Sequence, residues 1–262
     1  MDTRQKLLQA RQLEKTYQEK HRLGQKEPQV DFIKGLKNLG IDSMTDYHKL
    51  VKTDGYKGRN IEVRQVVSTP LQMAKDAVAD NKDIVMWEIS KNIRVYTGSL
   101  DVAEKTLNVD FCKKEGIELI PIGIKNNGWM SIAGNPSIQF ALKRPIDTSS
   151  FKNIGLQIIA DSLKEQFNLD IVIDGNDALV GNQKIFASVI SEFGDYGLVA
   201  FGMSMRTDRE LCKKVFKKPA LKIPTGIEEI VGHKIDAMTL IENVISKFAS
   251  VTGNTFEYEI KK

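Results

Sequence analysis

Residues 175–188 read Gly-Asn-Asp-Ala-Leu-Val-Gly-Asn-Gln-Lys-Ile-Phe-Ala-Ser, two apolar runs on either side of Gly181-Asn182. A Gly-Asn pair between apolar runs is typical of a tight turn that joins two antiparallel strands. We therefore expect a strand, a turn and a second strand here.

Lys184 follows this turn. Strand alternation places Ile185, Ala187 and Val189 on one face of the second strand and Lys184 on the opposite face. A lysine held in a fixed position can bind a carboxylate or a phosphate as a point charge. The pair Asn176-Asp177, just before the first strand, adds an amide and a carboxylate to the same space.

The composition indicates a water-soluble globular chain in a reducing compartment. The 262 residues contain no apolar run long enough to span a membrane, and the first residues lack the apolar core of a signal peptide. Two cysteines, Cys112 and Cys212, lie far apart in the sequence, which favours the cytoplasm over an oxidising compartment. The three histidines are scattered and predict no metal site.

Positive charge is concentrated near the N-terminus. Residues 1–60 carry 13 Lys/Arg and 8 Asp/Glu, a balance of +5, whereas the remaining residues carry 25 and 26. Such an excess is compatible with an acidic partner or with nucleic acid. No aromatic residues are interleaved with the basic ones, so we expect a solvated helical arm rather than a nucleic-acid site.

The hydrophobic pattern divides the chain into a basic helical extension, residues 1–58, and a second domain, residues 61–262. The second domain alternates strands with helices, and we expect a mixed α+β fold in which helices pack on a largely antiparallel sheet. The helices are expected at residues 3–21, 30–39, 43–52 (capped by Asp42), 70–80 (capped by Thr69), 100–115, 151–167, 208–216 and 236–250. Further strands are expected at residues 62–67, 83–89, 93–97, 118–124, 128–133, 137–143, 170–173, 196–205 and 255–260.

The order of these motifs resembles the lipoate- and biotin-protein ligase superfamily. The Asn-Asp pair before a hairpin with a lysine resembles the second signature of that superfamily, and residues 68–76 resemble its first helix. Residues 208–219 and 226–231 resemble the C-terminal connector of the lipoate-ligase branch. The resemblance is collinear from about residue 66 to the C-terminus and implies a fold of the class II synthetase type.

The loop at residues 121–135 departs from the family pattern. The family reads Arg-Arg-x-Ser/Thr-Gly-Gly-Gly-Ala-Val-x-His-Asp-x-Gly-Asn, whereas this chain reads Pro-Ile-Gly-Ile-Lys-Asn-Asn-Gly-Trp-Met-Ser-Ile-Ala-Gly-Asn. The paired arginines, the glycine triplet and the His-Asp are absent. The sequence Trp129-x-Ser131 is similar to a Trp-x-Ser of biotin ligases, and Lys125 is positioned to replace a lost arginine.

The resemblance implies a reaction in two steps. A lipoate-type acid reacts with ATP, with Mg²⁺ as cofactor, and the acyl group is then transferred to a lysine of an acceptor protein domain. In that reaction Lys184 would hold the acyl carboxylate and the adenylate phosphate. The residues that would contact substrate or nucleotide are Asn126, Asn127, Gly128, Gly134, Asn135, Asn176 and Asp177.

Plainer interpretations remain open. Lys184 can be an ordinary hairpin lysine, and Asn176-Asp177 can serve only to shape a turn. The chain can also be a catalytically inactive ligase fold that acts as a binding or structural module in a larger, virion-type assembly, with neighbours contacted by the basic arm. An open apolar pocket beside Lys184 would favour the enzyme. A pocket filled by Trp129, Met130 or Phe186 would favour the module.

Overall fold

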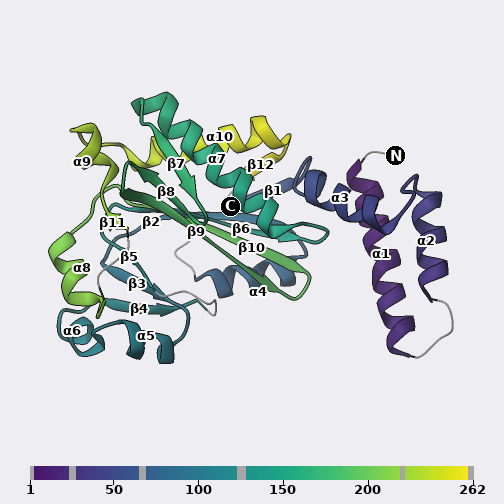
Figure 1. The fold of residues 1–262 in the computed structure, drawn as a ribbon, viewed down its shortest axis with the longest axis horizontal. Helices are drawn as coiled ribbons and strands as arrows, with labels where there is room; N and C mark the ends of the chain where they lie inside the picture. The colour runs from purple at the N-terminus through teal and green to yellow at the C-terminus, as the bar shows by residue number, and fades with distance from the viewer. Residues whose placement is uncertain (1–2, 24–27, 65–68, 123–127, 219–221, 259–262) are drawn as a thin grey trace.

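The computed structural model describes residues 3–23, 28–64, 69–122, 128–218 and 222–258. It confirms the expected fold class: a mixed α+β domain with a largely antiparallel sheet, packed helices and a helical N-terminal extension (Figure 1). Within this described part of the chain, none of the helices combines the length and apolarity that crossing a membrane requires.

The N-terminal helices form an arm that projects from one end of the sheet (Figure 1). They pack around a small core of their own, which contains Leu7, Phe32, Leu36 and Tyr47. These apolar residues recur at helical spacing, so each helix buries one stripe and leaves its charged side in solvent. The helices are α1 (Thr3–Arg22), α2 (Pro28–Asn38) and α3 (Met44–Asp54).

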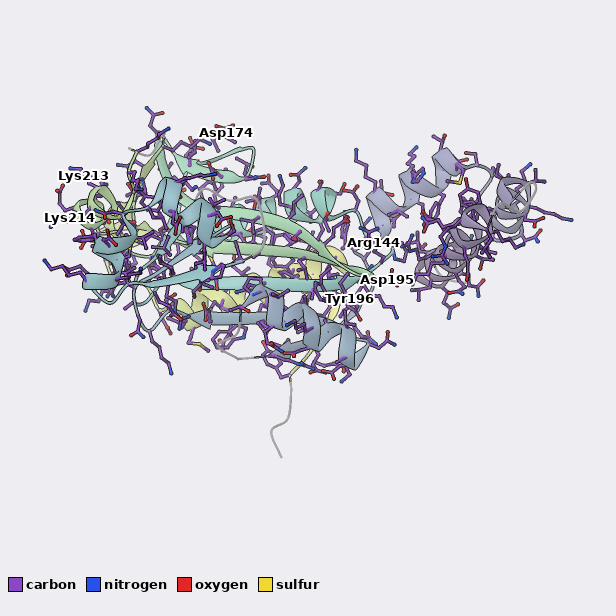
Figure 2. The ribbon with its side chains drawn as sticks, turned by 90° about the horizontal axis from the view of Figure 1, so that it is seen from below. Arg144, Asp174, Asp195, Tyr196, Lys213 and Lys214 are labelled. Atoms are coloured by element: carbon purple, nitrogen blue, oxygen red, sulfur yellow. The ribbon has the colours of Figure 1, made fainter. Side chains whose placement is uncertain are left out.

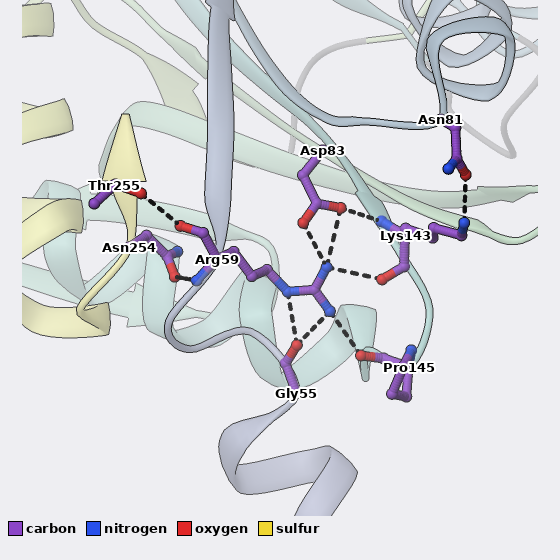
Figure 3. Close-up of polar contacts among 8 residues, drawn as sticks. All are labelled: Gly55, Arg59, Asn81, Asp83, Lys143, Pro145, Asn254 and Thr255. Atoms are coloured by element: carbon purple, nitrogen blue, oxygen red, sulfur yellow. Dashed lines mark hydrogen bonds and ion pairs between the residues drawn. The ribbon is translucent and has the colours of Figure 1, made fainter. Parts of the chain in front are cut away.

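A buried arginine joins the arm to the sheet (Figure 3). The guanidinium of Arg59 donates to both carboxylate oxygens of Asp83, at 3.1 and 3.0 Å, and to the backbone oxygens of Gly55, Lys143 and Pro145. Both charged side chains are almost fully buried. Because a buried charge without a partner is costly, this network fixes where α3 meets the first strand.

Eight strands form one continuous path across the main sheet, in the order β12-β1-β2-β6-β10-β9-β8-β7. Strand β1 pairs in parallel with β12 and β2, and the pairs from β2 to β7 are antiparallel. A short ninth strand, β11 (Ile223–Pro224), lies beside the start of β9. The others are β1 (Asn60–Arg64), β2 (Asp83–Ile89), β6 (Pro136–Lys143), β7 (Ile171–Asp174), β8 (Asp177–Val180), β9 (Gln183–Phe193), β10 (Tyr196–Met203) and β12 (Thr255–Tyr258).

Three strands that the sequence pattern suggested for the same sheet form a second, smaller one. Strand β3 (Arg94–Thr97) is central, parallel to β4 (Glu118–Pro121) and antiparallel to β5 (Trp129–Ser131). Hydrophobic alternation locates strands but does not say which sheet they join, because pairing partners depend on the tertiary fold.

Different helices cover the two faces of the main sheet (Figure 1). Helices α7 (Thr148–Phe167) and α10 (Ala237–Thr252) pack on one side, which we call the α7–α10 face. Helix α4 (Pro70–Asp80) packs on the other, the α4 face, and covers only part of it. The remaining helices are α5 (Leu100–Thr106), α6 (Val109–Lys114), α8 (Arg209–Val215) and α9 (Ile227–Val231).

Two helix ends differ from the expectation. Ser43, not Asp42, caps α3, and its hydroxyl accepts a hydrogen bond from Asp46 N at 3.1 Å. The helix expected over residues 100–115 is two helices, because Leu107 is extended and Asn108 caps a new start by accepting from Phe111 N. A capping residue inside an apolar pattern can restart a helix, and periodicity alone does not reveal it.

Candidate functional site

The turn at Gly181-Asn182 is present and joins β8 to β9 as expected. The register shifts between Ala178 and Leu179, so that Ala178 pairs with Phe186 while Leu179 pairs with Lys184. This bulge leaves one extra residue, Ile185, on β9.

The bulge keeps Lys184 opposite the buried Ile185 but places it on the same face as Ala187. Asp177 pairs directly with Ala187, so both side chains lie on one face of the sheet. Lys184 Nζ forms an ion pair with Asp177 Oδ1 at 2.8 Å and therefore reaches the same face. The expectation that Ala187 and Lys184 lie on opposite faces is wrong, because strict alternation does not allow for the extra residue.

A second lysine, Lys222, contacts the same carboxylate. We call the cluster of Asp174, Asp177, Lys184 and Lys222 the corner. Lys222 Nζ contacts Asp177 Oδ2 at 2.8 Å and Asp174 Oδ2 at 3.0 Å. Burial on its own would raise the pKa of Asp177, but the hydrogen bonds from Lys184 and Lys222 outweigh it and the pKa is lowered. Asp177 is thus a carboxylate that holds two ammonium groups in place.

Asn176 lies on the neighbouring turn, between β7 and β8. Its side-chain oxygen accepts from Lys152 Nζ at 2.7 Å, and its backbone oxygen accepts from Ser188 N at 2.7 Å. Gly175, the other residue of this turn, has a φ of +66°. The structure therefore brings Asp177 and Lys184 into contact and adds Lys222, whereas the Asn176 side chain bonds Lys152 of α7 instead.

A row of five paired residues runs across the α4 face from this corner. The successive partners are Asp177 on β8, Ala187 on β9, Gly202 on β10, Ser137 on β6 and Glu88 on β2. Directly paired residues point to the same side of a sheet, so the row is a continuous strip. With strands about 4.8 Å apart, it spans roughly 19 Å. A carboxylate stands at each end, and small side chains lie between.

Trp129 on β5 covers the middle of the row. A Cβ on Gly202 would lie 2.9 Å from Trp129 Nε1, so the indole rests against the bare backbone of that glycine. Lys184 Nζ lies 5.0 Å from the centre of the same ring, within range of a cation–π interaction. The small sheet therefore places the Trp129 indole over the strip and next to Lys184.

Polar side chains surround Glu88 at the β2 end of the strip. Glu88 is 5% exposed and accepts from Tyr96 Oη at 2.5 Å and from Arg94 Nη1 at 3.2 Å. Burial and the neighbouring Glu88 carboxylate raise the pKa of Tyr96. The contact between the two sheets is consequently polar on this side.

The remaining predicted residues lie around this strip. Both polar atoms of the Asn135 side chain bond the backbone of Arg206, at 3.0 and 3.1 Å, so Asn135 ties β6 to the end of β10. Gly134 precedes it in a turn with a φ of +92°. Gly128, with a φ of +116°, packs against Phe216, which leaves no room for a side chain. Asn126 and Asn127 lie outside the described residues, as does Lys125.

Several polar groups in or beside the strip were not among the predicted site residues: Glu88, Ser137, Gln139 and Tyr96. Residues 137–143 were expected to form a strand, and alternation within it already separates Ser137 and Gln139 from the apolar Ile138 and Phe140. Pairing with Gly202 and Glu88 depends on strand order, which the sequence does not supply.

The corner suits a phosphate better than a metal ion. Its lysines are cationic donors, whereas both oxygens of Asp177, the central carboxylate, already face ammonium groups. Among the described residues no group of three or more His, Cys, Asp or Glu side chains is placed to hold a metal. Magnesium usually relies on one or two free carboxylates together with phosphate oxygens, so the described side chains alone do not fit a Mg²⁺ site.

Two surface hollows lie away from this corner. One of about 350 Å³ is lined by α1 residues and Asp195, and one of about 220 Å³ lies beside β1. Neither is lined by Lys184 or Trp129. Figure 2 shows Asp195 next to the arm and Asp174 well away from it. The arm is therefore remote from Lys184.

Comparison with solved structures supports the fold. The chain is similar to a bipartite lipoate protein ligase from Thermoplasma acidophilum, at 16% identity, covering 78% of this chain and 87% of that one, with a TM-score of 0.64. It is similar to lipoate-protein ligase A bound with ATP, at 17% identity, 77% and 88% coverage and a TM-score of 0.64. P. falciparum LipL1 with lipoate matches at 17% identity, 77% and 66% coverage and a TM-score of 0.59.

The sequence comparisons find no match, either to a family model or to a curated protein. At these low identities, the structural likeness establishes that the chain has the fold of the lipoate-protein ligases, as the motif order predicted.

Proposed function

We propose that the chain is an acyltransferase of the lipoate-ligase type, which activates a carboxylic acid with ATP and transfers it to a lysine of an acceptor protein. The observation that carries this proposal is the corner at the start of β9. Lys184 lies on the α4 face, where Asp177 fixes it beside a shallow strip of small residues. A fixed cation at the end of such a strip is suited to an acid's carboxylate.

The first step forms a mixed anhydride. A carboxylate oxygen of the acid attacks the α-phosphorus of ATP, and the bond from that phosphorus to the pyrophosphate oxygen breaks. Negative charge grows on the oxygens around phosphorus, where the Lys184 ammonium would stabilise it. The ion pair of Lys184 with Asp177 keeps the ammonium in position before substrate arrives, which lowers the cost of organising the site.

The second step transfers the acyl group. The neutral amine of an acceptor lysine attacks the carbonyl carbon, the bond to the AMP oxygen breaks, and the amine loses a proton to solvent. Trp129 lies over the strip and would shield the anhydride from water on that side. Lys222 adds positive charge beside Asp177, where the nucleotide's phosphates would lie. Magnesium would enter with the nucleotide, held chiefly by its phosphates.

The partner is proposed to be a small protein domain that presents a lysine. One similar structure pairs a lipoate protein ligase with its E2 lipoyl domain. The arm lies at the opposite end of β9 and β10 from Lys184. We therefore propose that the arm contacts a neighbouring protein and not the reactive lysine of the acceptor. The free thiols of Cys112 and Cys212 suit the proposed cytoplasmic location.

A second candidate is a non-catalytic binding module with the ligase fold. The observation that favours it is Trp129, whose ring already occupies the space above Gly202. In this alternative the Lys184–Trp129 contact and the Lys184–Asp177 ion pair serve only to hold the two sheets together.

ATP–pyrophosphate exchange separates the two candidates. Exchange that depends on an added acid such as lipoate or octanoate, and that falls about 100-fold or more in Lys184→Ala, supports the enzyme. Lys247→Ala is the matched control, because Lys247 pairs with Glu165 on the α7–α10 side. Absence of exchange with every acid, together with absence of nucleotide binding by calorimetry, would establish the binding module instead.

A further inference from the structure

Three buried polar atoms on the α4 face have no hydrogen-bond partner among the described residues. Tyr196 Oη lies beside α4, and the other two lie on β6: Oε1 of Gln139, a residue that is 4% exposed, and Oγ of Ser137. Buried polar atoms are nearly always bonded, and the pair on β6 is therefore a candidate position for a further bound molecule. Both atoms lie on β6, two residues apart, so they point to the same side of the sheet.

Their side of the sheet is the one that Trp129 covers. Ser137 pairs with Gly202, whose missing side chain would point at the Trp129 indole. Gln139 pairs in turn with Ala200, the next residue of β10 on that face. Ser137 is therefore part of the strip, and Gln139 lies next to it on the same face.

The strip is shallow because its side chains are small. Ala187, Ala200 and Gly202 supply the floor on β9 and β10. On the opposite face of β10, Val199 and Phe201 are fully buried in the core. The same strands thus carry large side chains on one side and small ones on the other, where the Trp129 indole covers Gly202.

The strand spacing also sets the distance between Lys184 and the two unbonded atoms of β6. Lys184 Nζ lies 5.0 Å from the Trp129 ring, and that ring rests on Gly202. Ser137 lies one strand beyond Gly202, and Gln139 lies next along β6. A carboxylate held at Lys184 is consequently about 10 Å from Ser137, which is two strands from β9, and about 7 Å more of β6 separates Ser137 from Gln139.

We infer that the acid accepted here carries an amide group about 10 Å from its carboxylate, and that it is not a plain alkanoate. An amide offers an N–H to the Gln139 oxygen and a C=O to the Ser137 hydroxyl, which pairs both atoms at once. A hydrocarbon tail would leave both of them unbonded beneath it. This inference rests on the proposed function and narrows its substrate class.

The test uses a matched pair of acids. The first is 6-acetamidohexanoate, and the second is its N-methyl derivative, which has the same chain and carbonyl but no N–H. Calorimetric titration of the full chain should show the first binding about tenfold more tightly, which corresponds to one net hydrogen bond. Gln139→Leu should abolish this preference, and Ser137→Ala should weaken binding of both acids.

The wild-type comparison requires no variant, so it decides the question even if a substitution prevents folding. Equal affinity for the two acids would overturn the inference, as would a preference that survives Gln139→Leu. Exchange supported by octanoate as well as by 6-acetamidohexanoate would overturn the inference and leave the proposed acyltransferase standing. If no acid binds and none supports exchange, the inference and the proposed function both fail.

Discussion

The two faces of the main sheet are built from the same strands and differ sharply. On the α7–α10 face, Phe140 packs against Phe151 and Phe248 with ring centres 5.0 and 4.9 Å apart. On the α4 face, the neighbouring Gln139 is buried with an unbonded oxygen. One face is optimised for packing and the other is not, which is the expected pattern where a binding site is placed on a stable scaffold.

The largest predicted effect tests the packed face. Phe140→Ala removes a fully buried ring that three other aromatic rings surround, and these cannot all move to fill the space. We expect a loss of about 3–5 kcal/mol in the free energy of unfolding, measured with denaturant. A loss below about 1 kcal/mol would mean that this face is not the rigid one.

Two glycines give a matched comparison of the faces. A Cβ on Gly155 of α7 would lie 2.2 Å from the fully buried Phe201 ring, whereas one on Gly202 would lie 2.9 Å from the partly exposed Trp129. We expect Gly155→Ala to cost about 1–3 kcal/mol and Gly202→Ala less, because Trp129 can shift toward solvent. The reverse order in denaturant unfolding would contradict the contrast between the faces.

A smaller effect of opposite sign is expected at Gln139. Gln139→Leu keeps the volume and removes the unbonded oxygen, so the free chain should gain about 1 kcal/mol of stability. The same denaturant measurement checks it, with the solvent-facing Gln157→Leu of α7 as control. A loss of more than about 1 kcal/mol would show that the oxygen is already bonded in the free protein.

The smallest effect concerns pH and the corner residue Asp177. Its pKa is lowered in the folded chain, so between the folded and unfolded pKa values the unfolded chain binds more protons. This contribution to stability is present above the unfolded pKa and is lost as the pH falls through the folded pKa. Asp177→Asn should therefore show a shallower loss of stability below about pH 4, and identical acid profiles would contradict the assignment.

The sequence was sufficient for the parts of the fold that local chemistry determines. The turn at Gly181-Asn182, the Thr69 cap and the motif order that resembles lipoate ligases all concern residues close together in the chain. The bulge at Ile185 could not be predicted from the sequence, because a register shift follows from how two strands pack and not from either strand alone.

The candidate site was predicted only in part, for the same reason. Asp177 and Lys184 come into contact because adjacent strands carry them, whereas the Asn176 side chain bonds Lys152 of α7. Lys222 contacts Asp177 from 45 residues away along the chain, and Glu88 lies at the other end of the row, so both positions depend on the tertiary fold. The predicted roles of Gly128, Gly134 and Asn135 in binding stay predictions, and Asn135 already uses its side chain to join two strands.

The chain has two tryptophans, and each reports on a different face. Trp87 is buried in the core on the α7–α10 face, and Trp129 covers the strip beside Lys184. The most direct test is to follow both indole N–H signals by NMR while 6-acetamidohexanoate and ATP are added. We predict that the Trp129 signal shifts and the Trp87 signal does not. A Trp129 signal that stays in place with this acid, with lipoate and with octanoate would contradict the claim that the α4 face binds a ligand.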